Sequence, residues 1–532
     1  MKTRRSFTRG WQFLTAAALV GAAVSAAALG PYAASGQTGG QTGGARAGAP
    51  SVPPKQPREV AGVSKDLKID LGKSVKVALP ARKPALAPVR FKTADGKSGW
   101  VVRIPGGRPL ATPAYSNGRV FVGGGYGSHE FYAFDAKTGK LVWKTHTGDD
   151  GPTAAVIEDG LVAFNTESCT LVVVDEKTGK MVWQEWLGDP LMSQPAVSKG
   201  RLYMAYPKGQ RGGGQSRILK PSPNAPQKSQ QEEQGSHRLL CADLRTGRHI
   251  WERAISGDVI SAPVVSDGRV YATTFDGTSY SFDAVTGELA WKKENAGTSA
   301  PVVVGGDVVV TRKEERGGEA YEGMQRLDAR RGDARLEPMR ARSKAGYLGR
   351  NKGGGVAIRK EAQASLDSSV GFGSAPAAAE LSRANAHVGV STVVGGWAYQ
   401  GSRAAYSKGK MLNAQGRYLN SVNAEDGQFA WRAEVSGGGL APDAQVFSPP
   451  ALGEEFLYLA SSLGHLLSVD QKDGDVGFMY HFGEPMVFQP ALAEGGVYVG
   501  TSNGLLICLK TGSADADGWY AWGGNGEHNK NK

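Results

Sequence analysis

The sequence predicts an all-β protein in which eight four-stranded antiparallel blades form a ring. The first observation is a ten-residue segment that recurs as FDAKTGKLVW, VDEKTGKMVW, ADLRTGRHIW and FDAVTGELAW, ending at Trp143, Trp183, Trp251 and Trp291. The second is the spacing of about 40 residues between most of these tryptophans, which is typical of one blade per unit. A segment that recurs in this way is architectural, because each unit covers the apolar face of its neighbour.

The residues of one unit, 262–291, show how a blade is expected to form. Short runs of alternating β-branched and aromatic residues are separated by turns at Asp267-Gly268, Asp276-Gly277 and Thr286-Gly287. Such a pattern predicts antiparallel strands that follow one another in a meander. The aspartate can bond backbone groups of the turn, the glycine can adopt a positive φ, and the tryptophan can pack on the adjacent blade.

Less regular copies complete the ring. Residues 327–336, 422–431 and 469–478 keep parts of the motif, whereas the last unit, 489–512, has three strands without a fourth. The segment 91–100 carries the motif without a blade before it, so we expect it to supply the outer strand of the final blade and close the ring. The residues expected to dock one blade on the next are Asp135, Gly139, Trp143, Asp175, Gly179, Trp183, Asp243, Gly247, Trp251, Asp283, Gly287, Trp291, Gly427, Trp431, Gly96 and Trp100.

The N-terminal region resembles an export signal followed by a flexible linker. Residues 1–34 combine Arg4-Arg5 and Phe7 with an Ala-rich stretch, which resembles a twin-arginine signal, although an ordinary secretory signal is the alternative. Residues 35–65 are rich in Gly, Gln and Pro and are expected to be a flexible linker. Both signals predict a periplasmic or extracellular protein, and no cysteine near the cleavage region indicates a lipid anchor.

Two insertions and a tail interrupt the regular pattern of the predicted ring, residues 66–512. Residues 208–236 are polar and of low complexity, and residues 338–386 begin with a run of basic residues. The second insertion is either a solvated loop or a docking segment for an acidic partner or surface. The tail, 513–532, contains Trp519 and Trp522 and is expected to cap a face of the ring.

A search for other chemistry identifies no catalytic or metal-binding residue. Cys169, Cys241 and Cys508 lie far apart, and the eight histidines show no spacing typical of metal ligands. The string GTSNG at 500–504 resembles a nucleophile elbow by letter, but it joins two strand-like runs and predicts a hairpin turn. The net charge of +12 is spread along the chain. It favours solubility or attraction to an anionic surface over a nucleic-acid partner, and leaves peripheral membrane association open.

The eleven-residue frame Ala-x-Asp-x-x-x-Gly-x-x-x-Trp is complete at residues 133–143. It resembles the tryptophan-docking motif of the pyrroloquinoline-quinone (PQQ) repeat family. The resemblance covers roughly residues 90–512 and implies an eight-bladed β-propeller, but it specifies function far less than fold.

Two branches of that family suggest different functions. Quinoprotein dehydrogenases hold PQQ and Ca²⁺ in a central funnel, commonly with a disulfide between adjacent cysteines, whereas other members resemble a non-catalytic lipoprotein of outer-membrane assembly. This chain has no adjacent cysteines and no matching set of calcium ligands, and it also lacks the cysteine that would carry a lipid.

We therefore expect a monomeric, exported, non-catalytic propeller without a cofactor, which binds a protein or peptide partner in the cell envelope. One alternative is a PQQ- and calcium-dependent dehydrogenase of alcohols or sugars. The other is a polysaccharide-binding surface protein, for which Trp186 and Trp397 are candidate exposed aromatics.

Overall fold

The computed structural model describes residues 65–531 except 126, 150, 167–169, 188–192, 208–234, 275, 298, 317–318, 343–402 and 439–446. The predicted export signal, nearly all of the linker and most of both insertions lie outside the described residues, as do Cys169 and Trp397. The described ring belongs to one compact unit, which spans Lys55–Lys532.

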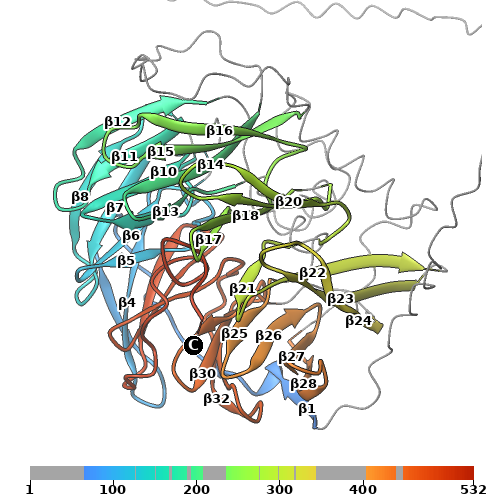
Figure 1. Ribbon diagram of the computed structural model, residues 1–532. Coiled ribbons are helices and arrows are strands. Elements are labelled where there is room, and N and C mark those ends of the chain that lie inside the picture. Colours follow the sequence, from blue (N-terminus) through green and yellow to red (C-terminus); the bar gives the residue numbers. More distant parts are fainter. Residues whose placement is uncertain are drawn as a thin grey trace, which may run out of the picture. The chain divides into compact units, whose positions relative to one another are not determined.

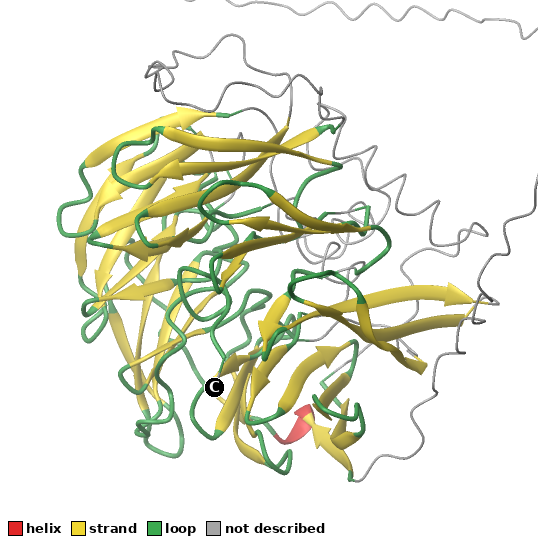
Figure 2. Ribbon diagram, in the orientation of Figure 1, coloured by secondary structure: helices red, strands yellow, loops and turns green. Residues whose placement is uncertain are grey.

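Eight antiparallel meanders form the blades, as predicted, and nearly all regular structure is strand (Figure 2). Blade 1 contains β5 (Ala114–Ser116), β6 (Arg119–Gly123), β7 (Glu130–Asp135) and β8 (Leu141–His146). Blade 2 contains β9 (Val156–Glu158), β10 (Leu161–Asn165), β11 (Thr170–Asp175) and β12 (Met181–Trp186). Blade 3 contains β13 (Ala196–Ser198), β14 (Arg201–Pro207), β15 (His237–Asp243) and β16 (His249–Ile255). Blade 4 contains β17 (Val264–Ser266), β18 (Arg269–Thr273), β19 (Ser279–Asp283) and β20 (Leu289–Lys293).

The second half of the ring follows the same order. Blade 5 contains β21 (Val302–Val304), β22 (Asp307–Arg316), β23 (Glu319–Asp328) and β24 (Ala334–Arg342). Blade 6 contains β25 (Ala405–Ser407), β26 (Lys410–Gln415), β27 (Tyr418–Asn423) and β28 (Phe429–Ser436). Blade 7 contains β29 (Ala451–Leu452), β30 (Phe456–Ala460), β31 (His465–Asp470) and β32 (Val476–His481). Blade 8 contains β33 (Ala491–Ala493), β34 (Gly496–Gly500), β35 (Leu505–Lys510) and the N-terminal strand β4 (Ser98–Arg103).

The ring closes through β4, which confirms the prediction for the final blade. This strand pairs antiparallel with β35, and Trp100 lies opposite Cys508. Figure 1 shows β4, in blue, beside the red C-terminal strands. The short first strands of neighbouring blades contact one another, as β5 does with β33 and β9, so these strands line the centre of the ring.

Three further N-terminal strands were not predicted. Strand β1 (Asp66–Asp70) pairs parallel with β28, and β2 (Val75–Lys76) pairs parallel with β32 after a short 3-10 helix, η1 (Leu71–Lys73). Strand β3 (Val89–Lys92) pairs with β4. The outer edges of blades 6, 7 and 8 are therefore covered by this N-terminal segment, which protects them from pairing with other chains.

Local sequence explains the hairpins. Asp267 and Gly268 both have a positive φ, 47° and 73°, which is the conformation of the tightest hairpin turns. The string at 500–504 is a turn between β34 and β35, where the Thr501 N–H donates to the carbonyl oxygen of Leu505 at 2.9 Å. That hairpin agrees with the interpretation made from the sequence.

One boundary differs from the sequence prediction. The fourth strand of blade 5, β24, continues to Arg342, although the second insertion was expected to begin at residue 338. Pairing with β23 explains the extension, because Arg342 lies opposite Tyr321 in a long antiparallel ladder.

Candidate functional site

The repeated aspartate organises the turn between the third and fourth strands of a blade. In blade 1, Asp135 Oδ1 accepts hydrogen bonds from Thr138 N at 2.7 Å and Thr138 Oγ1 at 2.6 Å. The Gly139 N–H donates to the carbonyl oxygen of Asp135 at 2.8 Å. The bonds from Thr138 lower the pKa of the Asp135 carboxyl group, so it stays ionised in this turn. Asp175, Asp243 and Asp283 accept equivalent bonds in blades 2, 3 and 4.

Each tryptophan docks on the turn of the following blade. Trp143 Nε1 donates to the carbonyl oxygen of Glu176 at 3.0 Å, and a Cβ atom added to Gly179 would lie 2.5 Å from the Trp143 ring. Only glycine leaves room for the ring at that position. The same bond runs from Trp100 to Ala136, Trp183 to Leu244, Trp251 to Ala284, Trp291 to Ala329 and Trp431 to Gln471. The glycines beneath these rings are Gly139, Gly247, Gly287, Gly332 and Gly474.

Two predicted glycines have different surroundings. Gly427 keeps the turn conformation, with φ of 75°, and its N–H donates to the carbonyl oxygen of Asn423 at 2.9 Å. A Cβ atom added to Gly96 would have nothing within 4 Å, so no ring docks there. The aromatic side chain of the preceding blade, Phe478, instead lies under the ammonium group of Lys97, at 5.9 Å from the ring centre. Gly96 therefore shapes a turn without receiving a ring.

Between blades 5 and 6, an arginine instead of a tryptophan donates a hydrogen bond to a backbone carbonyl oxygen in the following blade. Arg326 on β23 donates from Nη1 to the carbonyl oxygen of Ala424, the position equivalent to Glu176 and Ala136 in the other joints. Arg326 Nε also donates to Asp307 Oδ2 at 2.8 Å, and the Asp307 carboxylate is only 2% exposed. A buried carboxylate needs such a charged partner.

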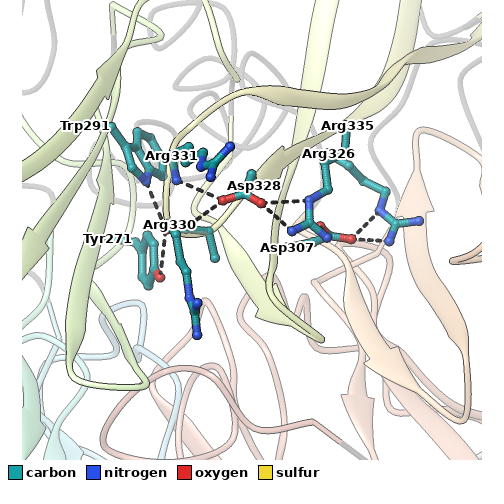
Figure 3. A network of polar contacts seen from close by, with 9 residues as sticks. Tyr271, Trp291, Asp307, Arg326, Asp328, Arg330, Arg331 and Arg335 are labelled. Atoms are coloured by element: carbon teal, nitrogen blue, oxygen red, sulfur yellow. Dashed lines mark hydrogen bonds and ion pairs between the residues drawn. The ribbon is translucent and has the colours of Figure 1, made fainter.

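Figure 3 shows this network beside the regular joint of Trp291. Arg335 lies 3.0 Å from Asp307 Oδ1 and donates from Nε to Asp328 Oδ2 at 3.0 Å. The bond from Arg335 lowers the pKa of Asp328 to about 2. Arg335 therefore connects the aspartate of the repeat to Asp307 on the neighbouring strand. The sequence contains no signal that predicts this ionic substitute for a tryptophan.

The C-terminal tail lies along the centre of the ring. The first strand of a blade leaves its inner backbone groups without a partner inside the sheet, and the tail supplies acceptors for several of them. The bonds run from Leu492 N to Trp519 O, Tyr115 N to Tyr520 O, Val197 N to Gly526 O, Val265 N to Glu527 O and Val303 N to Asn529 Oδ1, at 2.6–3.0 Å. The tail thus joins blades 8, 1, 3, 4 and 5, and Figure 1 places the C-terminus near β21. The sequence predicted that the tail caps a face of the ring, and in the structure its hydrogen bonds run to the inner strands of these blades.

Buried side chains hold the tail at the centre. Arg403, which precedes blade 6, donates from Nη2 to the carbonyl oxygens of Pro301 at 2.9 Å and His528, and its guanidinium group lies 4.6 Å from the centre of the Trp522 ring. The His528 ring nitrogens contact the carbonyl oxygens of Trp522 at 2.7 Å and Pro195 at 2.8 Å. Burial lowers the pKa of Arg403 to about 9, which leaves it protonated at neutral pH.

The described residues at the centre do not fit a site for PQQ and calcium. Calcium requires six or more oxygen ligands, and the described part of the chain contains no group of three or more His, Cys, Asp or Glu side chains that could hold a metal ion. The inner backbone groups of five blades bind the tail, and the side chains packed there include Arg403, His528, Trp519 and Trp522. Sequence reasoning missed Arg403 and His528, because neither belongs to a motif.

The outer edges of blades 1 to 5 remain uncovered by any other described strand. Their last strands β8, β12, β16, β20 and β24 each pair on one side only. Val142, Val182 and Leu289 on three of these strands are 42–48% exposed. Trp186, a candidate carbohydrate-binding aromatic, is partly buried at the end of β12. These edges can therefore accept an additional extended segment.

The comparison with known protein families gives one match that covers most of the chain. A family model described as "Outer membrane protein assembly factor BamB" matches residues 88–221, 226–351 and 367–522. A curated relative of that name from Yersinia pestis is 25% identical over 228 residues, which is 38% of this chain and 51% of the relative. The chain thus aligns with about half the length of that relative.

Solved structures resemble the chain at low sequence identity. BamB from Moraxella catarrhalis is 12% identical, with a TM-score of 0.48, and the match covers 79% of this chain and 98% of that protein. A quinohemoprotein alcohol dehydrogenase from Comamonas testosteroni is also 12% identical, with a TM-score of 0.49, and the match covers 85% of this chain and 79% of the dehydrogenase.

In the described residues, no helix is long and apolar enough to cross a membrane.

Proposed function

Because this chain belongs to the family described as outer membrane protein assembly factor BamB, we propose that it is an exported, non-catalytic scaffold in the cell envelope. Its partners would be other proteins, and it would take part in the assembly of outer-membrane proteins. The predicted export signal, residues 1–34, supports a position outside the cytoplasm.

The observation that carries this proposal is the tail at the centre of the ring. In the dehydrogenase branch of the PQQ-repeat family the centre would hold the cofactor. Here Trp519, Trp522 and His528 are all less than 5% exposed among the inner strands. Hydrogen bonds to the tail from the inner strands of five blades tie these blades together. A centre filled by the chain itself favours a rigid ring that binds partners through its faces and edges.

The outer edges of blades 1 to 5 supply one way to bind a partner. An extended segment of an unfolded outer-membrane protein can add a strand to such an edge, with backbone hydrogen bonds that do not depend on its sequence. The chain itself shows this geometry, because β1 lies parallel to β28 with Leu67 opposite Ala433 and Ile69 opposite Val435.

The test measures binding of an unfolded barrel protein and of the cofactor to the same preparation. The affinity tag belongs at the N-terminal side, because the C-terminus is held within the ring. We expect saturable binding of a urea-diluted outer-membrane barrel protein, weaker binding of an unfolded cytosolic protein, and no binding of PQQ with Ca²⁺. Saturable PQQ binding with dye reduction by alcohols or aldoses would instead support the dehydrogenase alternative.

A further inference from the structure

In each blade that is a complete four-stranded meander, a turn joins the third strand to the fourth. These turns all lie on the same face of the ring, because the strands follow the same order in every blade. The docking contacts place these turns side by side, since Trp100 packs on the turn of blade 1 and Trp143 on the turn of blade 2. Trp183 packs in the same way on the turn of blade 3. Residues at equivalent turn positions are therefore repeated around this face, one blade apart.

The turns of blades 1, 2 and 3 each carry two basic residues at equivalent positions. We name these six residues the basic arc: Lys137, Lys140, Lys177, Lys180, Arg245 and Arg248. All six are exposed. Among the described residues, the ion pairs of the structure involve none of the six.

The acidic residues of these three turns are occupied within the turns. The carboxylates of Asp135 and Asp175 accept bonds from the threonine of their own turn. Glu176 is 3% exposed and accepts hydrogen bonds from Asn117 Nδ2 at 3.0 and 3.3 Å. Asp135, Asp175 and Asp243 stay ionised, because hydrogen bonds within their turns lower the pKa of each. Of the charged side chains in these three turns, however, only the six bases of the arc are exposed.

The turns on the far side of the same face have the opposite charge. Blade 6 carries Glu425 and Asp426, both exposed, and blade 7 carries Asp473 and Asp475. In a ring of eight blades, blade 6 lies opposite blade 2, and blade 7 lies opposite blade 3. A flat anionic membrane would meet both signs of charge on this face, whereas a protein segment can follow the basic side alone.

We infer that the basic arc docks an extended Asp/Glu-rich segment of the protein partner, an inference that rests on the proposed scaffold function. Acidic side chains spaced to reach consecutive turns would form charge-assisted hydrogen bonds with the lysines and arginines. Because the bases are exposed, the main effect of the arc is faster association at low ionic strength.

The experiment compares two charge-reversal variants of the full chain. Lys177→Glu with Lys180→Glu reverses the arc in blade 2 and leaves Asp175, Thr178 and Gly179 in place, so the turn is retained. Lys73→Glu with Lys76→Glu makes the same change in net charge on η1 and β2, beside blades 6 and 7, where both lysines are exposed. The probes are a fluorescein-labelled poly-glutamate peptide and vesicles that contain phosphatidylglycerol.

We expect the peptide to bind in a salt-dependent manner and the arc variant to slow its association about tenfold or more, with little effect of the control variant. Equal slowing by both variants would mean that net charge alone matters and would overturn the inference. Arc-dependent binding of vesicles without binding of the peptide would also overturn it. If the arc variant binds the unfolded barrel protein as the unchanged chain does, the inference fails and the scaffold function stands. If the unchanged chain does not bind that protein, the scaffold function fails, and the peptide assay still tests the arc.

Discussion

Replacing Gly179 with alanine tests whether the docked tryptophan or the turn itself requires glycine. A Cβ atom at this position would lie 2.5 and 2.6 Å from two carbon atoms of the Trp143 ring, and Gly179 has a φ of 68°. Gly160, in the first turn of the same blade, has a φ of 74° but nothing within 4 Å of its added Cβ. The two positions therefore share the backbone cost and differ in the contact.

The expected losses of unfolding free energy follow from these two costs. A non-glycine residue in the left-handed region costs about 1–2 kcal/mol, which is the whole expectation for Gly160→Ala. Displacing a packed ring adds about 1–3 kcal/mol. We therefore expect Gly179→Ala to lose about 2–5 kcal/mol, more than the control by the cost of moving Trp143.

Urea unfolding followed by circular dichroism measures both variants, and a third variant isolates the contact. In a Trp143→Leu background the ring is gone, so Gly179→Ala should cost only as much as Gly160→Ala. The reasoning would be refuted if Gly179→Ala and Gly160→Ala lost equal free energy in the unchanged background. It would also be refuted if the leucine background failed to reduce the cost at Gly179.

Three further predictions concern ionic contacts and the tail. Burial lowers the pKa of His249, but the hydrogen bonds that its ring donates to Glu185 and Glu252 outweigh this effect and raise the pKa to about 9. The stabilisation of the folded state by protonated His249, about 3 kcal/mol, is therefore complete below pH 6.5 and lost as the pH rises through 9. Urea titrations of the unchanged chain and His249→Gln across that range should converge at high pH, and a constant difference would contradict the pKa. Arg326→Leu should lower the unfolding free energy by about 3–5 kcal/mol, because the buried Asp307 loses a partner, and adding Asp307→Asn should recover part of the loss. Removing residues 513–532 should lower the melting temperature and speed the hydrogen exchange of inner-strand amides such as Val197 N–H. Unchanged hydrogen exchange would show that the tail does not stabilise the inner strands.

The turns and docking tryptophans could be predicted because their chemistry is local. Asp135, Gly139 and Trp143 lie within nine residues of one another, and the turn needs that acceptor, that positive φ and that ring at fixed spacing. Strand β4 could also be placed, since a blade with three strands needs a fourth. The added strands β1 and β2 could not, because two or three alternating apolar residues, such as Leu67 and Ile69, fit many edges equally well.

The sequence by itself determined the repeating unit, the number of blades and the closure of the ring, because these depend on motifs that recur at a constant spacing. Only the tertiary structure decided what fills the centre and where charge gathers on a face. Arg403 donates a hydrogen bond to the carbonyl oxygen of His528, which lies 125 residues away in the sequence. The six residues of the basic arc come from three separate blades. Contacts of this kind depend on the curvature of the ring, which brings together residues that no local pattern relates.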